Sequence, residues 1–248
     1  MKYASPFVML GLRFLIASLL LFGVLRSFRP IVNKDTILLS VLTSGSAGFW
    51  VLGLLYVSPS ESAVLSYTMP LIAIPLSSLL LSEKASHKEW AGAIVGFVGV
   101  LVYSFTVIEN RTLSVLGAIL TLINALCWAG YTIYLRRLRN QEPTATVATQ
   151  LLFGAVVFFL LIPLDYTVRA TPSFLFDLGY LSLVSGAGSF LLWNGLARLQ
   201  KVGKMSTLIY STPAAVTAVQ CIETSSIPPL VSLVGICVMI FGIYISRM

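Results

Sequence analysis

The sequence contains few charged residues. Only 10% of its 248 residues are Asp, Glu, Lys or Arg, whereas 57% are hydrophobic. A soluble domain carries roughly 25% charged residues, so a chain this poor in charge cannot cover a water-facing surface. The composition excludes a soluble globular protein and predicts an integral membrane protein.

Residue types that serve catalysis or metal binding are also scarce. His87 is the only histidine, and it lies in the charged stretch SEKASHKEW. The cysteines Cys127, Cys221 and Cys237 lie inside apolar runs without paired spacing. An intramembrane enzyme needs clustered acidic, histidine or nucleophilic side chains, so it is the weaker alternative. We expect no enzyme activity, no metal site and no cofactor.

The sequence is rich in long uncharged stretches. Eight of them have 18 residues or more: Thr36–Ser60, Ser62–Ser82, Trp90–Ile108, Thr112–Leu135, Pro143–Leu164, Leu178–Ala197, Met205–Ile222 and Thr224–Ser246. A ninth, Tyr3–Leu25, is interrupted only by Arg13. Such a stretch crosses roughly 30 Å of hydrocarbon as a helix, and none shows the alternation of a barrel strand. The pattern predicts an all-α integral membrane protein with about nine transmembrane helices.

Basic residues are distributed unequally between the two sides that nine spans define. One side holds twelve: Arg26, Arg29, Lys34, Lys84, Lys88, Arg136, Arg137, Arg139, Arg198, Lys201, Lys204 and Arg247. The other side holds only Lys2, Arg111 and Arg169. The positive-inside rule then predicts a multi-pass protein of the cell membrane with a cytoplasmic C-terminus. The asymmetry explains the net charge of +7 through contact with membrane lipid, without nucleic acid.

Two segments in opposite halves repeat one pattern. YTMPLIAIPLSSLLLSE begins at Tyr67 and YSTPAAVTAVQCIE begins at Tyr210, so Pro70 and Pro213 occupy the same place. The first four spans correspond to the sixth through ninth, in opposite orientation, which predicts two inverted repeats at residues 1–109 and 110–248. Inverted repeats place a substrate site near the bilayer midplane. We expect both prolines to break helices beside that site, although kinks for packing are the alternative.

The order and spacing of these segments resemble the EamA-type branch of the drug/metabolite transporter superfamily. The matching stretches are SPFVMLGLRFLIA, LSYTMPLIAIPLSSLLLSE, EWAGAIVGFVGVLVY, LGAILTLINALCWAGYTIYLRRL and LLWNGLARLQ, and they cover essentially the whole chain. The resemblance implies a ten-helix inverted-repeat fold. With nine spans predicted, we expect the first helix of that fold to be absent, because the span at 113–135 has no partner in the first half; a start upstream of Met1 is the alternative.

The resemblance and the repeat together imply a secondary transporter. We expect an exporter or facilitator of small organic metabolites, such as amino acids, that works by alternating access. An inactive or partner-dependent membrane subunit is the alternative, motivated by the missing helix. The glycines Gly92, Gly96 and Gly99 form a small-residue face that packs against a neighbouring helix or supports a homodimer.

Polar and aromatic groups deep inside the spans are the candidates for lining a cavity, because such groups are costly in lipid. They are Trp50, Tyr67, Asn124, Trp128, Tyr131, Trp193, Asn194 and Tyr210. Packing and interfacial anchoring are the alternatives for the aromatic residues.

Arg13 is the lone charge well inside a span. It could meet a substrate carboxylate, contact a carbonyl left free by a neighbouring helix, or reach the interface through its long side chain. The family pattern has an arginine here, which implies a shared structural role.

Overall fold

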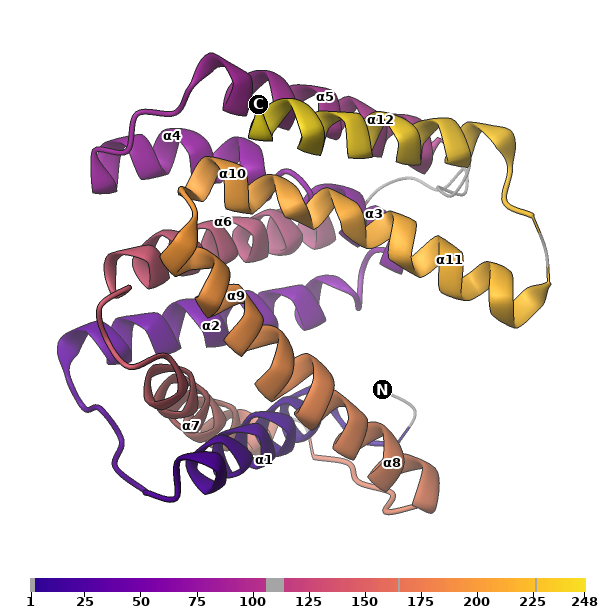
Figure 1. The fold of residues 1–248 in the computed structure, drawn as a ribbon. Coiled ribbons are helices and arrows are strands. Elements are labelled where there is room, and N and C mark those ends of the chain that lie inside the picture. Colours follow the sequence, from indigo (N-terminus) through magenta and orange to yellow (C-terminus); the bar gives the residue numbers. More distant parts are fainter. Residues whose placement is uncertain (1–2, 106–113, 165, 226) are drawn as a thin grey trace. The chain divides into compact units, whose positions relative to one another are not determined.

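The structure is a computed structural model of the chain, and it describes residues 3–105, 114–164, 166–225 and 227–248 (Figure 1). These residues fold into helices. An isolated antiparallel bridge also pairs Ala4 with Val168. The predicted all-α fold class is confirmed. The boundary expected between the repeats, at residues 109 and 110, lies outside the described residues, as do Lys2 and Arg111.

The helices group into two compact units that do not coincide with the sequence halves. Unit 1 comprises Met1–Val51 and Tyr134–Leu199, and unit 2 comprises Leu52–Ile133 and Gln200–Met248. Unit 1 holds α1 (Pro6–Leu25), most of α2 (Lys34–Gly53), the end of α6 (Val115–Arg137), α7 (Pro143–Leu161), η1 (Ile162–Leu164), α8 (Pro172–Tyr180), η2 (Leu181–Gly188) and α9 (Ser189–Leu199). Each unit therefore draws on both halves of the sequence.

Unit 2 holds the remaining helices. They are α3 (Pro59–Ser66), α4 (Met69–Leu81), α5 (His87–Ser104), most of α6, α10 (Val202–Ser206), η3 (Thr207–Ser211), α11 (Thr212–Thr224) and α12 (Leu230–Arg247). Two expected spans are divided here, one into α3 and α4 and the other into α10, η3 and α11.

Seven helical runs among the described residues are long and apolar enough to cross a membrane. They are Pro6–Leu25, Lys34–Gly53, Pro59–Leu81, Val115–Arg137, Pro143–Leu161, Pro172–Leu199 and Leu230–Arg247. The other two expected spans are helical too, but α5 begins with the polar residues His87, Lys88 and Glu89, and η3 interrupts the run from α10 to α11. Helices thus occupy all nine predicted spans, and seven of them have the length and hydropathy of a full crossing.

Several helices begin at residues that favour the start of a helix. Prolines stand in the first turn of α1, α3, α7 and α8: Pro6, Pro59, Pro143 and Pro172. Proline is favoured there because its missing N–H is not needed and its φ is already helical. At α3, the Ser58 Oγ accepts from the Glu61 N–H at 3.2 Å, and the Glu61 carboxylate accepts from the Ser58 N–H at 2.7 Å. This reciprocal capping box satisfies two backbone donors that a helix start leaves open.

In unit 1, α1 packs along α7 in antiparallel fashion. The Phe14 ring meets the Phe158 ring edge-on at a centroid distance of 5.4 Å. A Cβ added to Gly154 would lie 2.7 Å from the Phe14 ring, so only glycine allows this approach. Further along α1, the Ser18 hydroxyl donates to the Ala148 carbonyl at 2.8 Å. Because residues later in α1 meet residues earlier in α7, the two helices run in opposite directions.

In unit 2, α5 packs along α12, also antiparallel (Figure 1). A Cβ added to Gly92 would lie 2.5 Å from the Gly242 carbonyl oxygen, and one added to Gly99 would lie 2.6 Å from the Met239 nitrogen. One added to Gly242 would lie 2.4 Å from the Gly96 nitrogen. Small residues allow two backbones to approach this closely. The small-residue face predicted on α5 therefore packs against a neighbouring helix of the same chain.

Candidate functional site

The predicted cavity residues are divided between the two units. Unit 1 contains Arg13 on α1, Trp50 on α2, and Trp193 and Asn194 on α9. Unit 2 contains Tyr67, Pro70, Asn124, Trp128, Tyr131, Tyr210 and Pro213.

In unit 2, Pro70 and Pro213 stand at matching places after matching breaks. α3 ends at Ser66 and α4 begins at Met69, so Pro70 is the second residue of a new helix. Pro213 is likewise the second residue of α11, after the 3-10 segment η3. A proline in the first turn needs no N–H partner, and it prevents an α-helix from continuing unbroken through that point. Each proline thus stands in the first turn of its helix, directly after the end of the preceding helical segment.

The middle of α6 contacts the first of these breaks. The Asn124 Nδ2 donates to the Ser66 Oγ at 3.0 Å, and Ser66 is the last residue of α3. One turn further along α6, the Trp128 and Tyr131 rings lie 5.0 Å apart with an angle of 40° between them. Trp128 is half-buried, whereas Tyr131 is fully buried. The middle of α6 therefore carries an amide bonded to the end of α3 and an aromatic pair one turn further along.

The tyrosines that precede the two prolines have different surroundings. Tyr67 is half-buried, and its side chain hydrogen-bonds Thr212 at the start of α11. Tyr210 is fully buried, and its hydroxyl donates to the Ala93 carbonyl at 3.0 Å. A Cβ added to Gly96 would lie 2.3 Å from the Tyr210 ring. The ring of Tyr210 thus fills the space beside Gly96, while Tyr67 links the two broken helices.

In unit 1, Asn194 belongs to a polar network at the C-terminal end of α9. Its Oδ1 accepts from the Arg198 Nε at 2.9 Å, and Arg198 also donates to the Gln141 carbonyl. The Arg136 Nη1 donates to the carbonyls of Ala197 and Arg198 at 3.0 and 2.7 Å. Cations that bind the last carbonyls of a helix oppose its dipole. The network therefore holds the C-terminal end of α9 in place.

The two tryptophans of unit 1 are accessible to different degrees. Trp50 lies near the end of α2 and is 40% exposed. Trp193 is partly buried on α9, directly before the buried Asn194. Neither indole is fully buried.

Arg13 points at η2, a π-helical segment of unit 1. Its Nη2 donates to the Ser185 carbonyl at 3.0 Å and to the Ser185 Oγ at 2.8 Å. The sequence left three roles open for Arg13. In the structure its guanidinium contacts a carbonyl of a neighbouring helical segment, which is one of those three.

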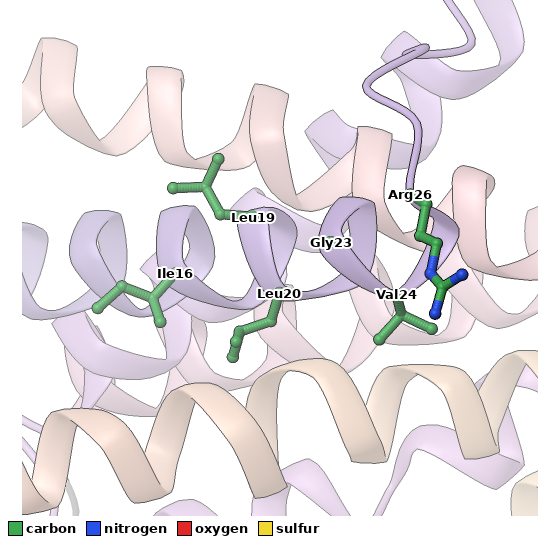
Figure 2. Close-up of a pocket in the computed structure, with 6 residues that line it drawn as sticks. All are labelled: Ile16, Leu19, Leu20, Gly23, Val24 and Arg26. Carbon is green, nitrogen blue, oxygen red and sulfur yellow. The ribbon is translucent and has the colours of Figure 1, made fainter.

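A groove of about 630 Å³ runs along the second half of α1 (Figure 2). The α1 residues that line it are Ile16, Leu19, Leu20, Gly23, Val24 and Arg26, with Arg26 at the end of the helix. These residues are apolar except for Arg26, and the set includes none of the predicted cavity residues. No group of three or more His, Cys, Asp or Glu suited to a metal ion occurs in the part of the chain that the structure describes.

The sequence profile of the EamA-like transporter family matches residues 1–105 and 115–248. The chain belongs to that family. An uncharacterized transporter of Acidianus ambivalens is 45% identical to this EamA-like chain over 240 residues, 96% of this chain and 92% of the relative. A second, from Archaeoglobus fulgidus, is 23% identical over 254 residues, 98% of this chain and 89% of the relative. The Escherichia coli inner membrane transporter YedA is 30% identical over 162 residues, 62% of this chain and 52% of its own length.

A solved crystal structure shares the fold of this EamA-like chain. The TM-score is 0.88 at 19% sequence identity, and the match covers 98% of this chain and 89% of the other. The likeness at this identity concerns the fold alone. It agrees with the all-helical membrane architecture expected from the sequence.

Three residues of these networks were not singled out from the sequence of this family member. Arg198 follows Asn194 by four positions, a helical spacing that could have revealed the pair. Ser66 and Ser185 carried no such signal, because their partners lie 58 and 172 residues away. Only folding brings those pairs together.

Proposed function

We propose that the chain is a secondary transporter of small organic metabolites such as amino acids. In this proposal, the inverted repeats 1–109 and 110–248 alternate the access of one substrate site between the two sides of the membrane. Family membership and the names of the relatives support a transporter rather than an enzyme. The substrate class rests on the mixture of aromatic and amide groups in the candidate site.

The observation that carries the proposal is the pairing of repeat mates. α1 and α7 correspond in the two repeats, and so do α5 and α12. Each pair packs antiparallel, as the contacts Ser18–Ala148 and Gly92–Gly242 illustrate. A two-fold axis in the membrane plane reverses a helix, so mates that meet near such an axis run antiparallel. This geometry supports an inverted repeat.

The matching breaks at Pro70 and Pro213 support a site between the repeats. Irregular backbone is tolerated at membrane depth only where it is buried in protein or lines a cavity. Broken helices in corresponding positions are the usual mark of a transporter binding site. We assign direct substrate contact to the partly exposed Trp50, Tyr67, Trp128 and Trp193, with Asn124, Asn194, Tyr131 and Tyr210 holding the surrounding backbone or rings in place.

The proposed location is the cell membrane with the C-terminus in the cytoplasm. The unequal distribution of basic residues supports this orientation, and the name of the relative YedA refers to an inner membrane. A homodimer would use a surface other than the glycine face of α5, because α12 occupies that face within the chain.

The test is uptake by proteoliposomes that contain only this chain. A mixed pool of amino acids and other metabolites is offered, and the accumulated compounds are read by mass spectrometry against empty liposomes. We expect accumulation of at least one compound and a loss of at least tenfold in Trp193→Ala. The matched control is Trp90→Ala, which removes an exposed tryptophan at the start of α5 and should leave uptake unchanged.

Folded protein that accumulates nothing from the pool would contradict transport by this chain alone. Equal uptake in Trp193→Ala and wild type would contradict the site while leaving transport in place. Activity that appears only with a second membrane subunit would favour a partner-dependent role.

A further inference from the structure

The helical run from Pro172 to Leu199 contains an unusual segment. Its middle, η2 (Leu181–Gly188), is a π-helix placed between α8 and α9. In a π-helix each N–H bonds five residues back instead of four, so a turn accommodates about one extra residue. Such segments make up well under 1% of residues and are frequent at functional sites. An eight-residue example in a transport protein therefore calls for a physical cause.

The Ser189 N–H at the end of η2 does not follow the α-helical pattern. In a regular α-helix the Ser189 N–H would bond the Ser185 carbonyl, four residues back. Here the Ser189 N–H instead bonds the carbonyls of Val184 and Gly186. The Ser189 hydroxyl also donates to the Val184 carbonyl, at 2.9 Å. The Ser185 carbonyl thus lacks the partner that an α-helix would give it.

Arg13 donates to Ser185 from the neighbouring helix α1. Its Nη2 lies 3.0 Å from the Ser185 carbonyl and 2.8 Å from the Ser185 Oγ. These two bonds fix the position of Ser185 relative to α1, so they stabilise the π-helical form, in which Ser185 lies within reach of the guanidinium. Gly186 makes the contact possible, because a Cβ there would lie 2.8 Å from the Cβ of Ala17 on α1.

The extra residue in η2 sets the rotation of α9. The buried residues Phe190, Asn194 and Ala197 follow the spacing of one helix face. Leu192 and Leu199, 73% and 83% exposed, lie on another face. If η2 relaxed to an α-helix, the extra residue would pass into α9 and rotate it by about 100°. Trp193 would then face a different direction, and Arg198 would leave its contact with the Gln141 carbonyl.

We propose that Arg13 is a positioning residue that keeps η2 π-helical and thereby sets the rotation of α9. Arg13 acts through the Ser185 carbonyl and not by touching a substrate. The inference deepens the proposed function, on which it rests for the role of Trp193 in binding. The rotation of α9 itself is measurable without any substrate.

The test is a spin-label scan of α9. Cys127, Cys221 and Cys237 are first replaced by alanine, and positions 190–199 are then changed to cysteine one at a time. Each is labelled, and its collision rate with oxygen is measured in liposomes. In the otherwise native chain we expect maxima at positions 192 and 199 and minima at 190, 194 and 197.

Arg13→Met keeps the length of the side chain and removes its donors. We expect the whole pattern to shift by one position, about 100° around the helix. Arg13→Lys retains a charged donor, so the maxima and minima of the collision rate should stay at their native positions. Removing Gly188 in the Arg13→Met background takes out the extra residue, so it should restore the phase. A loss of folding alone would not be repaired by that deletion.

Arg26→Met is the matched control, because it removes an exposed arginine at the end of the same helix. It should leave the pattern unchanged. An unshifted pattern in Arg13→Met would overturn the proposal. An increased substrate KM in Arg13→Met, together with the native pattern of oxygen collision rates, would also overturn the proposal. This result would mean that Arg13 contacts the substrate directly. If Arg13→Met does not fold, the scan is repeated in Arg13→Gln, whose shorter side chain does not reach Ser185. The same shift by one position is then expected.

The two proposals fail separately. A shifted pattern without any uptake would support the positioning role and contradict transport by the chain. Uptake with an unshifted pattern would support transport and contradict the positioning role.

Discussion

At the residue scale, the two amide side chains of the candidate site are hydrogen-bonded to other side chains. Asn124 on α6 donates to Ser66 at the end of α3, and Asn194 on α9 accepts from Arg198. Both amides are buried, where an unpaired polar group would be costly. Their contacts account for amides within stretches that are otherwise apolar.

The bond between Asn124 and Ser66 predicts a measurable coupling. Asn124→Ala and Ser66→Ala should each lower the free energy of unfolding in mixed micelles. In a double-mutant cycle their coupling should be about 0.6–1.7 kcal/mol, the range found for hydrogen bonds between membrane helices. The matched control combines Asn124→Ala with Ser104→Ala, whose hydroxyl bonds the Val100 carbonyl within α5. The control changes should add independently, and a coupling near zero in the test pair would contradict the assignment.

At the element scale, glycines decide how closely the helices approach. The contact of α5 with α12 brings Gly242 against the backbone of Gly96, which cannot move aside as a flexible side chain would. Other glycines, such as Gly23 near the end of α1, have nothing within 4 Å of an added Cβ. The same residue type therefore has a packing role in one place and none in another.

Gly242→Ala tests the packing of α5 on α12. The added methyl group overlaps backbone atoms, so the free energy of unfolding should fall by about 1–3 kcal/mol. Gly23→Ala is the matched control, and it should be neutral or stabilising by up to about 1 kcal/mol because alanine favours a helix. Chemical unfolding of both variants in the same detergent gives the comparison. Equal stability in the two would show that the close contact is not needed.

At the scale of the whole molecule, the compact units combine the halves of the sequence. Unit 1 joins α1 and α2 with α7, α8 and α9, and unit 2 joins α3, α4 and α5 with α10, α11 and α12. Each half thus contributes helices to both units. The two inverted repeats remain a prediction from the sequence, whereas the two units are seen in the packing of the helices.

The predicted orientation is tested by labelling intact cells. In a cysteine-free background, Ala170→Cys lies in the exposed loop before α8 and Lys84→Cys in the exposed loop before α5. A membrane-impermeant maleimide should label position 170 in intact cells and position 84 only after the cells are opened. The positive-inside rule places the many basic loops, including that of Lys84, in the cytoplasm. Labelling with the opposite preference would reverse the orientation.

The sequence by itself determined the membrane class, the helical stretches and the repeated Tyr-x-x-Pro pattern that contains Pro70 and Pro213. These properties depend on composition and on residues near each other in the chain, since hydrophobicity and proline act locally. Only the tertiary structure decided that Arg13 binds Ser185 in a π-helix and that Tyr210 fills the space beside Gly96. It also decided that the packing units cross the halves of the sequence. Such features depend on contacts between residues about a hundred or more positions apart, and no local pattern encodes them.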